Sequence, residues 1–467
     1  MWDKESVTQA VAAQRRYFRS GATLPLKFRK QMLIRLRESV IAHSKEMEEA
    51  LAEDLGRSAV EAYLFDVGTV IYEINEAIHG LKKWAKSERH YSGLLNFPSM
   101  TTKVYKMPYG VALIISPFNF PFLLSLGVLS ACIAGGNTAV MKASSKSKKS
   151  TECLSHIIAD AFPPEYCVVI DGGHDVADFC LEERFDKIFY TGSPRVGVHV
   201  MEMAAKHLTP VALELGGENG NWAIVRKDAD LKDAARKIAF FKIANAGQIC
   251  ININQVAVAE EVAEEFIECL KKEIVRQIGE KPLENPEYPH LIGASAYKWC
   301  AKDAEDYKDR IVFGGHGDEA ALRFEPTIIY PVKTNESIVN HELFCPLLPI
   351  VPFKDAEIDQ LLDVIESREH GLAFYLFTKD MRWAKKTMQS CQYGGGCVNE
   401  VCVHLMVKGV PFNGVGHSGM GAYHGAWGFR EFTHPSTVLF GKRKGNLPLR
   451  EHPYTEKKKK LMKHFLK

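Results

Sequence analysis

Apolar side chains recur at helical spacing through the first part of the chain. Over residues 5–86 this pattern predicts helices, each with one apolar face. The first long helix has Pro25 near its start and runs to about Leu55, and Gly56 is typical of a helix end. A second helix is predicted over about 58–87.

From Val111 onward, short apolar runs alternate with amphipathic segments. Strands are predicted at 111–115, 138–142, 166–170, 187–190 and 210–214. Helices are predicted near 121–133, 147–161, 174–183 and 195–207. The alternation indicates a parallel sheet covered by helices on both faces, and ligands of such sheets bind beyond the carboxyl ends of the strands.

After Gly220 a second alternating region continues to about residue 405. It contains a long helix near 260–278 and a polar surface insertion around 281–292. Both alternating regions predict the α/β class.

Two segments depart from this alternation. Residues 90–107 pass from turn-like residues into an exposed strand at 101–105, so we expect an arm that packs elsewhere, for example on a partner subunit. The tail combines Lys457 to Lys460 with a basic amphipathic end. A solvated, partly disordered terminus is favoured there over contact with anionic lipid.

Composition and charge describe an ordinary globular protein. The length of 467 residues indicates more than one domain, because single cores stop growing near ~250–300 residues. The net charge of +2 gives no reason to expect a nucleic-acid partner. The eleven cysteines are never spaced as C-x-x-C, so neither a disulfide framework nor a metal site is predicted. A reducing compartment and the lack of a secretory pattern at the N-terminus predict a cytoplasmic protein.

One segment has the length and apolarity of a membrane span. No residue from Tyr109 to Met141 is charged. However, Pro117, Asn119 and Pro121 interrupt the segment near its start. A strand, a loop and a buried helix are therefore predicted, and no membrane span.

Cys250 is the candidate nucleophile. It follows Asn245-Ala246-Gly247-Gln248-Ile249, where small residues let the backbone turn closely and present the sulfur to a cavity. Thiols titrate near pH ~8.5, so such a site must lower that value or use a small thiolate fraction. The alternative is a small core hydrophobe, the usual state of a lone cysteine.

The residues that follow the predicted strands are the other candidates. After the first strand, two prolines hold the Asn119 amide in a fixed direction, as an oxyanion donor requires, although asparagine more often closes a turn. After the second strand, Lys142 to Lys146 offer ammonium and hydroxyl groups where an NAD site would place a carboxylate, which favours the phosphate of NADP; solvated lysines are the alternative.

The fourth and fifth strands lead into an anion site and a buried acid. Gly192 and Ser193 stand at a helix N-terminus, where free backbone N–H groups bind anions. Glu214 ends an apolar strand just before Gly216 and Gly217. Burial of a carboxylate there costs free energy, which indicates that Glu214 has a functional role.

A G-x-G-x-x-G sequence occurs at Gly414, Gly416 and Gly419. It has no clear strand before it and no helix directly after it, so it is not predicted to bind a dinucleotide. A glycine-rich loop near an active site fits better.

Several motifs in order carry a resemblance to a known family. The motifs are Pro117-Phe118-Asn119-Phe120-Pro121, Val140-Met141-Lys142, Tyr190-Thr191-Gly192-Ser193, Glu214-Leu215-Gly216-Gly217, Gly247-Gln248-Ile249-Cys250, Glu342-Leu343-Phe344-Cys345-Pro346 and Pro411-Phe412 with its glycines. Together they resemble the aldehyde dehydrogenase superfamily over nearly the whole length. The run from Ser418 to Gly425 is similar to the class 3 branch in particular.

The resemblance implies roles for these residues. Cys250 would attack the aldehyde, Asn119 and the Cys250 N–H would hold the oxyanion, and Glu214 would activate the water that hydrolyses a thioester. The implied NAD(P) site consists of Ser116, Pro117, Lys142, Ser144, Ser145, Gly192, Ser193, Val196, Leu215, Gly216, Glu342 and Phe344. In it Lys142 and Glu342 would hold the two riboses, Ser193 a phosphate, and Phe344 would pack beside the nicotinamide.

Some positions depart from the family pattern. Ser145 stands where a ribose-binding glutamate is common, which moves the expected cofactor toward NADP or dual use. Cys345, Glu218 and Asn413 replace a glycine, a lysine and a glycine, and Pro194-Arg195 alters the phosphate loop.

The family fold implies a Rossmann-like parallel-sheet cofactor domain, a second α/β catalytic domain and a small bridging or oligomerisation arm. The expected boundaries are 1–89 and 108–217 for the cofactor domain, 218–425 for the catalytic domain, and 90–107 and 426–467 for the arm and tail. A homodimer acting on medium-chain aliphatic or aromatic aldehydes is implied. The alternatives are a coenzyme-A-acylating dehydrogenase and a non-catalytic protein that keeps the fold.

Overall fold

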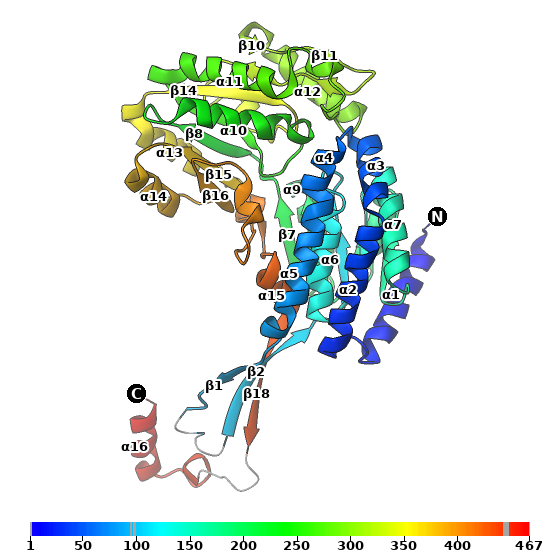
Figure 1. The fold of residues 1–467 in the computed structure, drawn as a ribbon. Helices are drawn as coiled ribbons and strands as arrows, with labels where there is room; N and C mark the ends of the chain where they lie inside the picture. Colours follow the sequence, from blue (N-terminus) through cyan, green and yellow to red (C-terminus); the bar gives the residue numbers. More distant parts are fainter. Residues whose placement is uncertain (1, 94–95, 97–99, 442–447, 467) are drawn as a thin grey trace.

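Two large sheets and a projecting arm organise the chain (Figure 1). The structure is a computed structural model that describes residues 2–93, 96, 100–441 and 448–466. Residues 94–95, 97–99 and 442–447, which belong to the predicted arm and tail, lie outside the described part.

The first sheet has six strands in the order β17-β7-β6-β3-β4-β5. All neighbours are parallel except β17, which runs antiparallel to β7. The strands are β3 (Val111–Ile115), β4 (Thr138–Lys142), β5 (Cys167–Ile170), β6 (Lys187–Gly192), β7 (Val211–Leu215) and β17 (Gly419–Met420). The five parallel strands occur where the apolar runs predicted them.

Helices cover both faces of this sheet. One face packs against α1 (Lys4–Arg19), α8 (His174–Glu182) and α9 (Pro194–Ala205). The other face carries α6 (Val128–Gly135) and α7 (Lys148–Ala161), and α2 (Leu26–Ala42), α3 (Ser44–Leu55), α5 (Gly68–Trp84) and α15 (Gly425–Glu431) form a further layer over them. Both faces are therefore buried, which explains why the strands are mainly apolar on both faces.

The strand order creates a switch point between β3 and β6. The chain runs outward from β3 to β4 and β5, then returns to β6 on the other side of β3 and continues to β7. Loops that leave β3 and β6 at their carboxyl ends therefore diverge, and the crevice between them is where open α/β sheets bind ligands.

The second sheet has seven strands in the order β10-β13-β14-β9-β8-β15-β16. Its strands are β8 (Asn221–Val225), β9 (Ile253–Ala259), β10 (Ile311–Phe313), β13 (Thr327–Ile329), β14 (Leu347–Phe353), β15 (Ala373–Phe377) and β16 (Gly395–Val398). Helices α10 (Leu231–Ile243) and α11 (Ala263–Ile278) cover one face, and α12 (Ala294–Asp306), α13 (Ile358–Glu366) and α14 (Met381–Ser390) cover the other. This confirms the mixed α/β fold with parallel sheets.

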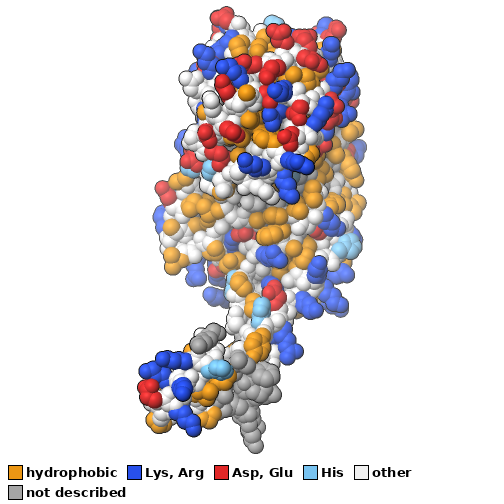
Figure 2. Space-filling view, turned by 90° about the vertical axis from the view of Figure 1, so that its left-hand side faces the viewer, with side chains coloured by type: hydrophobic (Ala, Val, Ile, Leu, Met, Phe, Trp, Pro, Cys, Tyr) orange, Lys and Arg blue, Asp and Glu red, His pale blue; other side chains and the backbone are white. Residues whose placement is uncertain are grey.

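The arm is a three-stranded antiparallel sheet that projects from the first sheet (Figure 1). It consists of β1 (Glu88–His90), β2 (Met100–Pro108) and β18 (Thr433–Gly441), with β2 in the middle. In the tail, residues 456–465 form the helix α16 (Glu456–Phe465), which is capped by the Thr455 side chain and buries none of its residues, in keeping with the expected solvated terminus. Figure 2 shows Lys and Arg side chains gathered at the end of the arm, where α16 lies.

Two expectations about the helices and the insertion differ from the structure. The helix predicted from Pro25 to Leu55 is broken at His43, because the Ser44 hydroxyl donates to the carbonyls of Val40 and Ile41 and competes with the helix there. The predicted insertion at 281–292 is not confined to the surface, since Tyr288 is fully buried and donates to Phe324 O at 2.7 Å.

The uncharged segment at 109–141 forms β3, a loop, a π-helical turn η2 (Leu123–Gly127), α6 and β4. Within the described residues there is no helix with the length and apolarity needed to traverse a lipid bilayer.

Candidate active site

Cys250 lies in a tight connection between α10 and β9. The preceding turn places Asn245 and Ala246 in the left-handed region, both at φ 49°. Gly247 follows at φ +78°, and a Cβ there would lie 2.4 Å from the carbonyl oxygen of Cys345. The Asn221 amide donates to Cys250 O at 2.8 Å and fixes the end of the turn. Cys250 is partly exposed and packs against the main apolar core.

Cys250 lines a pocket whose walls are mainly apolar. The residues that face it come from the π-helical turn η1 (Tyr63–Val67), α5, η2, α10, the turn before Cys250 and the 402–424 segment. They include Phe65, Phe120, Leu124, Ile249, Met406 and Phe412. Two buried polar atoms in this lining, Tyr423 Oη and His424 Nε2, have no hydrogen-bond partner among the described residues.

The surroundings of Cys250 oppose its ionisation. Burial raises the pKa of the thiol to about 12, and the carboxyls of Glu342 and Glu214 act in the same direction. The two carboxyls therefore lie close enough to Cys250 to act on its thiol, although the three residues come from separate segments. Without a further group, the thiol stays protonated at neutral pH.

Glu214 sits at the end of β7 and is fully buried. Burial raises the pKa of its carboxyl well above the ordinary value, with a smaller contribution from Glu431. Neither carboxyl oxygen has a hydrogen-bond partner among the described residues. A buried carboxyl without partners is costly, which is typical of a functional acid or base.

The glycine-rich segment lies directly beside Glu214. Gly419 pairs with Glu214 across β17 and β7 at φ +133°, and a Cβ on Gly419 would lie 2.1 Å from Leu213 O. The glycines therefore let the backbone close over the strand that carries the acid, and no helix starts directly after them.

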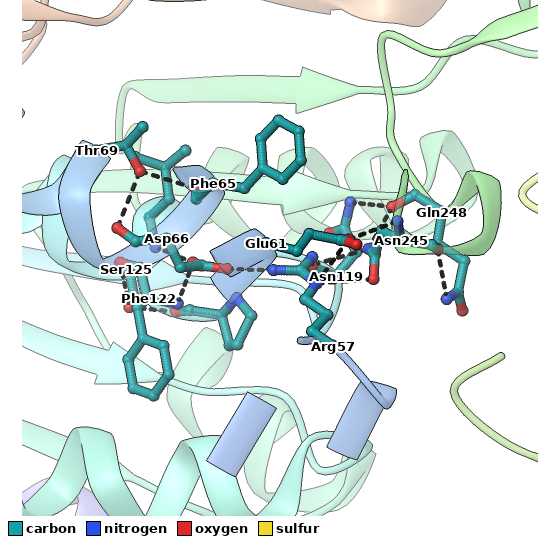
Figure 3. A network of polar contacts seen from close by, with 12 residues as sticks. Arg57, Glu61, Phe65, Asp66, Thr69, Asn119, Phe122, Ser125, Asn245 and Gln248 are labelled. Atoms are coloured by element: carbon teal, nitrogen blue, oxygen red, sulfur yellow. Dashed lines mark hydrogen bonds and ion pairs between the residues drawn. The ribbon is translucent and has the colours of Figure 1, made fainter. Parts of the chain in front are cut away.

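Asn119 belongs to the loop after β3 and is buried. One N–H of its amide donates to Gln248 O at 3.1 Å, which connects it to the turn that ends in Cys250. The backbone carbonyl oxygen of Asn119 accepts hydrogen bonds from Arg57 Nη2 and from Asn245 Nδ2. Figure 3 shows these contacts and the Asp66 carboxylate that bonds to Arg57.

Glu342 and Phe344 lie across from the first sheet. A Cβ on Gly216 would lie 2.0 Å from Glu342 Oε1, so the Glu342 carboxyl reaches the backbone at Gly216. Burial raises the pKa of the Glu342 carboxyl to about 8. The Phe344 ring meets Phe118 edge-on with centroids 5.9 Å apart, which joins the loop after β3 to the second sheet.

The residues after β4 combine a buried ammonium with exposed hydroxyls. Lys142 Nζ donates to Ala143 O at 2.7 Å and to Gly172 O at 2.8 Å, and burial lowers its pKa. Ser144 is half-buried and Ser145 is exposed. Ser116 N donates to Lys142 O at 3.2 Å, so the segments after β3 and β4 are joined at the carboxyl edge.

The segment after β6 opens a helix. Ser193 is the N-cap residue of α9, and its hydroxyl makes no cap hydrogen bond. Gly192 and Val196 are half-buried on either side of it. Leu215 is buried and packs close to Gly197, which seats α9 on the sheet.

The residues of the predicted cofactor site thus come from the edge at which the two large sheets face each other. Pro117 and the neighbouring Ser116 follow β3 beside the switch point, and the α9 N-terminus follows β6. Within the described residues, no group of three or more His, Cys, Asp or Glu side chains is placed to hold a metal ion.

Sequence reasoning missed Arg57, Asp66, Asn245, Tyr423 and His424. Arg57 directly follows the helix-ending Gly56, where a solvated arginine is the ordinary expectation. Asp66 lies within the π-helical turn η1 (Tyr63–Val67), which shifts the apolar phase by one residue. The sequence offers one indication of Asp66, namely a charged residue at a position where the helical periodicity predicts an apolar one.

Comparison with known proteins identifies the family. The model of the "Aldehyde dehydrogenase family" matches residues 1–438. The chain belongs to the aldehyde dehydrogenase family. This confirms the resemblance seen in the motifs and makes the protein an oxidoreductase enzyme that acts on aldehydes.

Relatives within the aldehyde dehydrogenase family include class 3 proteins. Aldehyde dehydrogenase family 3 member H1 of Arabidopsis thaliana is 35% identical over 456 residues, which cover 97% of this chain and 93% of that protein. Aldehyde dehydrogenase family 3 member A2 of Mus musculus is 36% identical and covers 97% and 92%. 4,4'-diaponeurosporen-aldehyde dehydrogenase of Staphylococcus aureus is 34% identical and covers 96% and 97%.

Solved aldehyde dehydrogenase structures share the fold. The substrate-bound state of Staphylococcus aureus AldH has a TM-score of 0.95 at 33% identity and covers 99% of both chains. The glyceraldehyde-3-phosphate dehydrogenase GapN of Methanocaldococcus jannaschii, complexed with NADP, has a TM-score of 0.84 at 28% identity and covers 94% of this chain and 95% of that chain.

Proposed function

We propose that this chain oxidises an aldehyde to the carboxylic acid with NAD(P), through a thioester on Cys250. The observation that carries the proposal is a partly exposed thiol at an apolar pocket, with the unpartnered buried carboxyl of Glu214 acting electrostatically on it and the Asn119 amide bonded to the turn that ends in it.

The first step is attack of the Cys250 sulfur on the aldehyde carbonyl, which forms a tetrahedral thiohemiacetal. Asn119 donates one amide N–H to Gln248 O, so its second N–H is available to the developing oxyanion. The backbone N–H of Cys250 is the second donor. Losing one such donor typically costs about 3–4 kcal/mol of barrier.

The residues around Glu342 fit a nicotinamide nucleotide. The Glu342 carboxyl oxygen occupies the space that a Cβ on Gly216 would fill. A carboxyl group that can bind ribose hydroxyls therefore lies against the backbone of Gly216. Glu342, Lys142 and Ser193 would hold the nucleotide, and Phe344 would pack beside its ring. When bound, the nucleotide supplies the hydride acceptor and a positive charge that favours the thiolate.

The last step is hydrolysis of the thioester by water. Glu214 is the base for that water, because a carboxyl with a pKa raised by burial is strong enough to accept a proton near neutral pH. The same residue argues against coenzyme-A acylation, in which a thiol takes the acyl group and no such base is required.

NADP or dual cofactor use is supported by the residues after β4. Ser145 is exposed and offers a hydroxyl where a carboxylate would exclude the 2′-phosphate. Lys146 adds a cation, with its Nζ 5.4 Å from the centroid of the Phe118 ring. The Methanocaldococcus jannaschii relative is complexed with NADP.

The pocket lining supports a medium-chain aliphatic or aromatic aldehyde as substrate. Its walls are built from aromatic and aliphatic side chains, which gain free energy by covering an apolar chain. The Staphylococcus aureus relative is named for an aldehyde, 4,4'-diaponeurosporen-aldehyde.

A homodimer and a cytoplasmic location are also proposed. The edge strand β18 exposes Val438, Leu439 and Phe440. An exposed apolar edge strand is a surface on which a second subunit can pack. All eleven cysteines are free, which fits a reducing compartment.

The test is an assay of the purified protein with hexanal, octanal, decanal and benzaldehyde, each with NAD and with NADP. We expect carboxylic acid as the product, independent of coenzyme A, and loss of activity in Cys250→Ala. Thioester formation that depends on coenzyme A would favour the acylating alternative. No aldehyde-dependent reduction of either cofactor over a broad panel would favour a non-catalytic protein.

A further inference from the structure

Arg57 is a buried cation beside the proposed catalytic residues. It directly follows Gly56 at the end of α3 and is only 2% exposed. Its guanidinium lies 4.5 Å from the centroid of the Phe120 ring. An arginine this deep in a protein is costly unless all of its donors have a task.

Each side of the guanidinium bonds to a different segment. Nε donates to Asn245 Oδ1 at 2.9 Å, in the turn that leads to Cys250. Nη1 donates to Asp66 Oδ2 at 2.6 Å, and Nη2 donates to the carbonyl oxygen of Asn119. One planar group therefore connects η1, the loop after β3 and the turn before the nucleophile (Figure 3).

Asp66 extends this connection to the start of η2. Its Oδ1 accepts from the backbone N–H groups of Phe122 at 3.2 Å and Leu123 at 2.8 Å. The pair Arg57–Asp66 therefore binds the loop of Asn119 at two points. Arg57 bonds to the Asn119 carbonyl, and Asp66 bonds to the two residues that follow Pro121.

Asn245 carries the connection to the thiol. It holds a left-handed conformation, its backbone N–H donates to Glu61 Oε1 at 2.7 Å, and its Nδ2 donates to Asn119 O at 3.1 Å and Gln248 O at 3.0 Å. Gln248 O is also the acceptor of the Asn119 side chain. Arg57 therefore sets the distance between the Asn119 amide and the backbone two residues before Cys250.

We propose that Arg57 is a positioning residue for aldehyde oxidation, which holds the Asn119 amide and the Cys250 turn in one fixed arrangement so that both can act on the same carbonyl. This inference rests on the proposed function. Three directional bonds in one plane require the guanidinium fork, which a lysine ammonium cannot reproduce.

The main test variant is Arg57→Met/Asp66→Asn, which removes both charges of the 2.6 Å pair; Glu61, whose Oε1 lies 3.8 Å from Arg57 Nε, keeps its hydrogen bond from Asn245 N. The remote pair Arg226–Asp355 provides a matched control, because Arg226 donates to both Asp355 oxygens, at 2.9 and 2.6 Å, and stacks on Trp383. The control variant is Arg226→Met/Asp355→Asn. For each purified protein, kcat, the aldehyde KM, the Kd of the cofactor and Tm are measured.

A positioning role predicts a kcat about 100-fold lower in the Arg57 double variant, the order of loss caused by ~1 Å of misplacement. The Kd of the cofactor is expected to stay within about threefold, since Arg57 touches none of the proposed cofactor residues. The control variant is expected to keep wild-type kcat, whatever its Tm. A kcat of the Arg57 variant within about threefold of wild type would overturn the inference.

The variant Arg57→Lys tests the positioning role of Arg57 if the double variant does not fold. It keeps the charge beside Asp66 but loses the bonds to Asn245 and Asn119, so kcat is expected to fall at least about tenfold. A kcat within about threefold of wild type would again overturn the inference.

A double-mutant cycle with Asn119→Ala separates positioning from general destabilisation. If Arg57 acts through Asn119, then Asn119→Ala lowers kcat less in the Arg57→Lys background than in the wild type. Equal losses in both backgrounds would contradict that link. The proposed function fails separately, if Cys250→Ala retains aldehyde oxidation; an inactive Cys250→Ala beside fully active Arg57 variants would remove only the present inference.

Discussion

At the scale of single residues, Cys250 is held as a neutral thiol by its surroundings. Burial and the two nearby carboxyls raise its pKa to about 12. Glu342 titrates in an accessible range, because burial raises its pKa to about 8. The negative charge next to the thiol therefore appears only above that pH.

The variant Glu342→Gln removes that charge and is expected to make Cys250 more reactive in the absence of cofactor. At pH 9, where Glu342 is largely ionised, the variant should react with iodoacetamide roughly threefold to tenfold faster than wild type. At pH 6.5, where Glu342 is protonated, the two proteins should react at the same rate. The rate is measured by mass spectrometry of the Cys250 peptide, since ten other cysteines are present. A slower variant at pH 9 would contradict the electrostatic argument.

The variant Glu214→Gln should block hydrolysis but not acylation. We expect a first turnover that reduces about one cofactor per site, followed by a steady state at least about 100-fold slower. Rapid mixing measures the burst, and mass spectrometry of the intact protein detects the acyl group on Cys250. Glu369→Gln, at an exposed carboxylate, is the control and should turn over normally.

The variant Ser145→Glu should discriminate between the two cofactors. A carboxylate at this exposed position would repel the 2′-phosphate, so KM for NADP is expected to rise at least about tenfold and KM for NAD by less than threefold. Ser295→Glu, on the exposed first turn of α12, controls for the added charge. Equal rises for both cofactors would remove this reading of position 145.

A site residue could be predicted from the sequence only where its neighbours in the chain indicate its role. Cys250, Glu214 and Asn119 follow strands or small-residue turns, so their local sequence marks them. Arg57 and Asn245 act through contacts between segments 188 residues apart, as in the Nε bond to Asn245 Oδ1, and no local pattern signals that pairing. His424 likewise meets Glu73 at 2.9 Å across 351 residues.

At the scale of elements, two π-helical turns shape the catalytic edge. The turn η1 lies between α4 (Ala59–Ala62) and α5, whereas η2 forms the start of the helix that continues as α6. Asp66 of η1 accepts the N–H groups at the start of η2. Such turns insert one residue and re-aim the side chains that follow, and they are frequent at functional sites. Apolar periodicity predicts the helices there but not these insertions, just as it does not predict the break at His43.

The pairing of β17 with β7 can be tested through Gly419. In Gly419→Ala the new Cβ would lie 2.1 Å from Leu213 O at a backbone φ of +133°, so β17 must move away from Glu214. We expect a loss of at least about 2 kcal/mol in the free energy of unfolding, together with a lower kcat. Urea denaturation and steady-state kinetics measure the two effects. Gly293→Ala, where a Cβ meets nothing within 4 Å, should change neither.

At the scale of the whole molecule, the arm is built from two distant parts of the chain. The arm strand β2 follows the N-terminal helices, whereas its partner β18 comes from the last part of the chain. The arm ends in an exposed apolar edge and the basic helix α16. This exposed apolar edge is the surface that the proposed dimer would cover.

Replacing Leu439, which is 43% exposed on β18, by lysine should weaken the proposed dimer. A buried unpaired charge at an interface is strongly unfavourable, so light scattering at micromolar concentration should report the monomer mass. Trp299→Lys, at an exposed site on α12, should leave the mass unchanged. A wild-type protein that is itself monomeric would remove the dimer proposal.

The position of β17 in the sequence has a consequence for biosynthesis. Glu214 and β7 leave the ribosome before the second sheet is made, but β17, which closes their side of the first sheet, follows the second sheet in the chain. Throughout translation of the second sheet, β7 is an open edge with unpaired N–H and C=O groups, the kind of surface that draws chaperones or misassembles. A nascent chain released before Gly419 would thus carry every proposed catalytic residue and still lack the pairing that holds the acid in place.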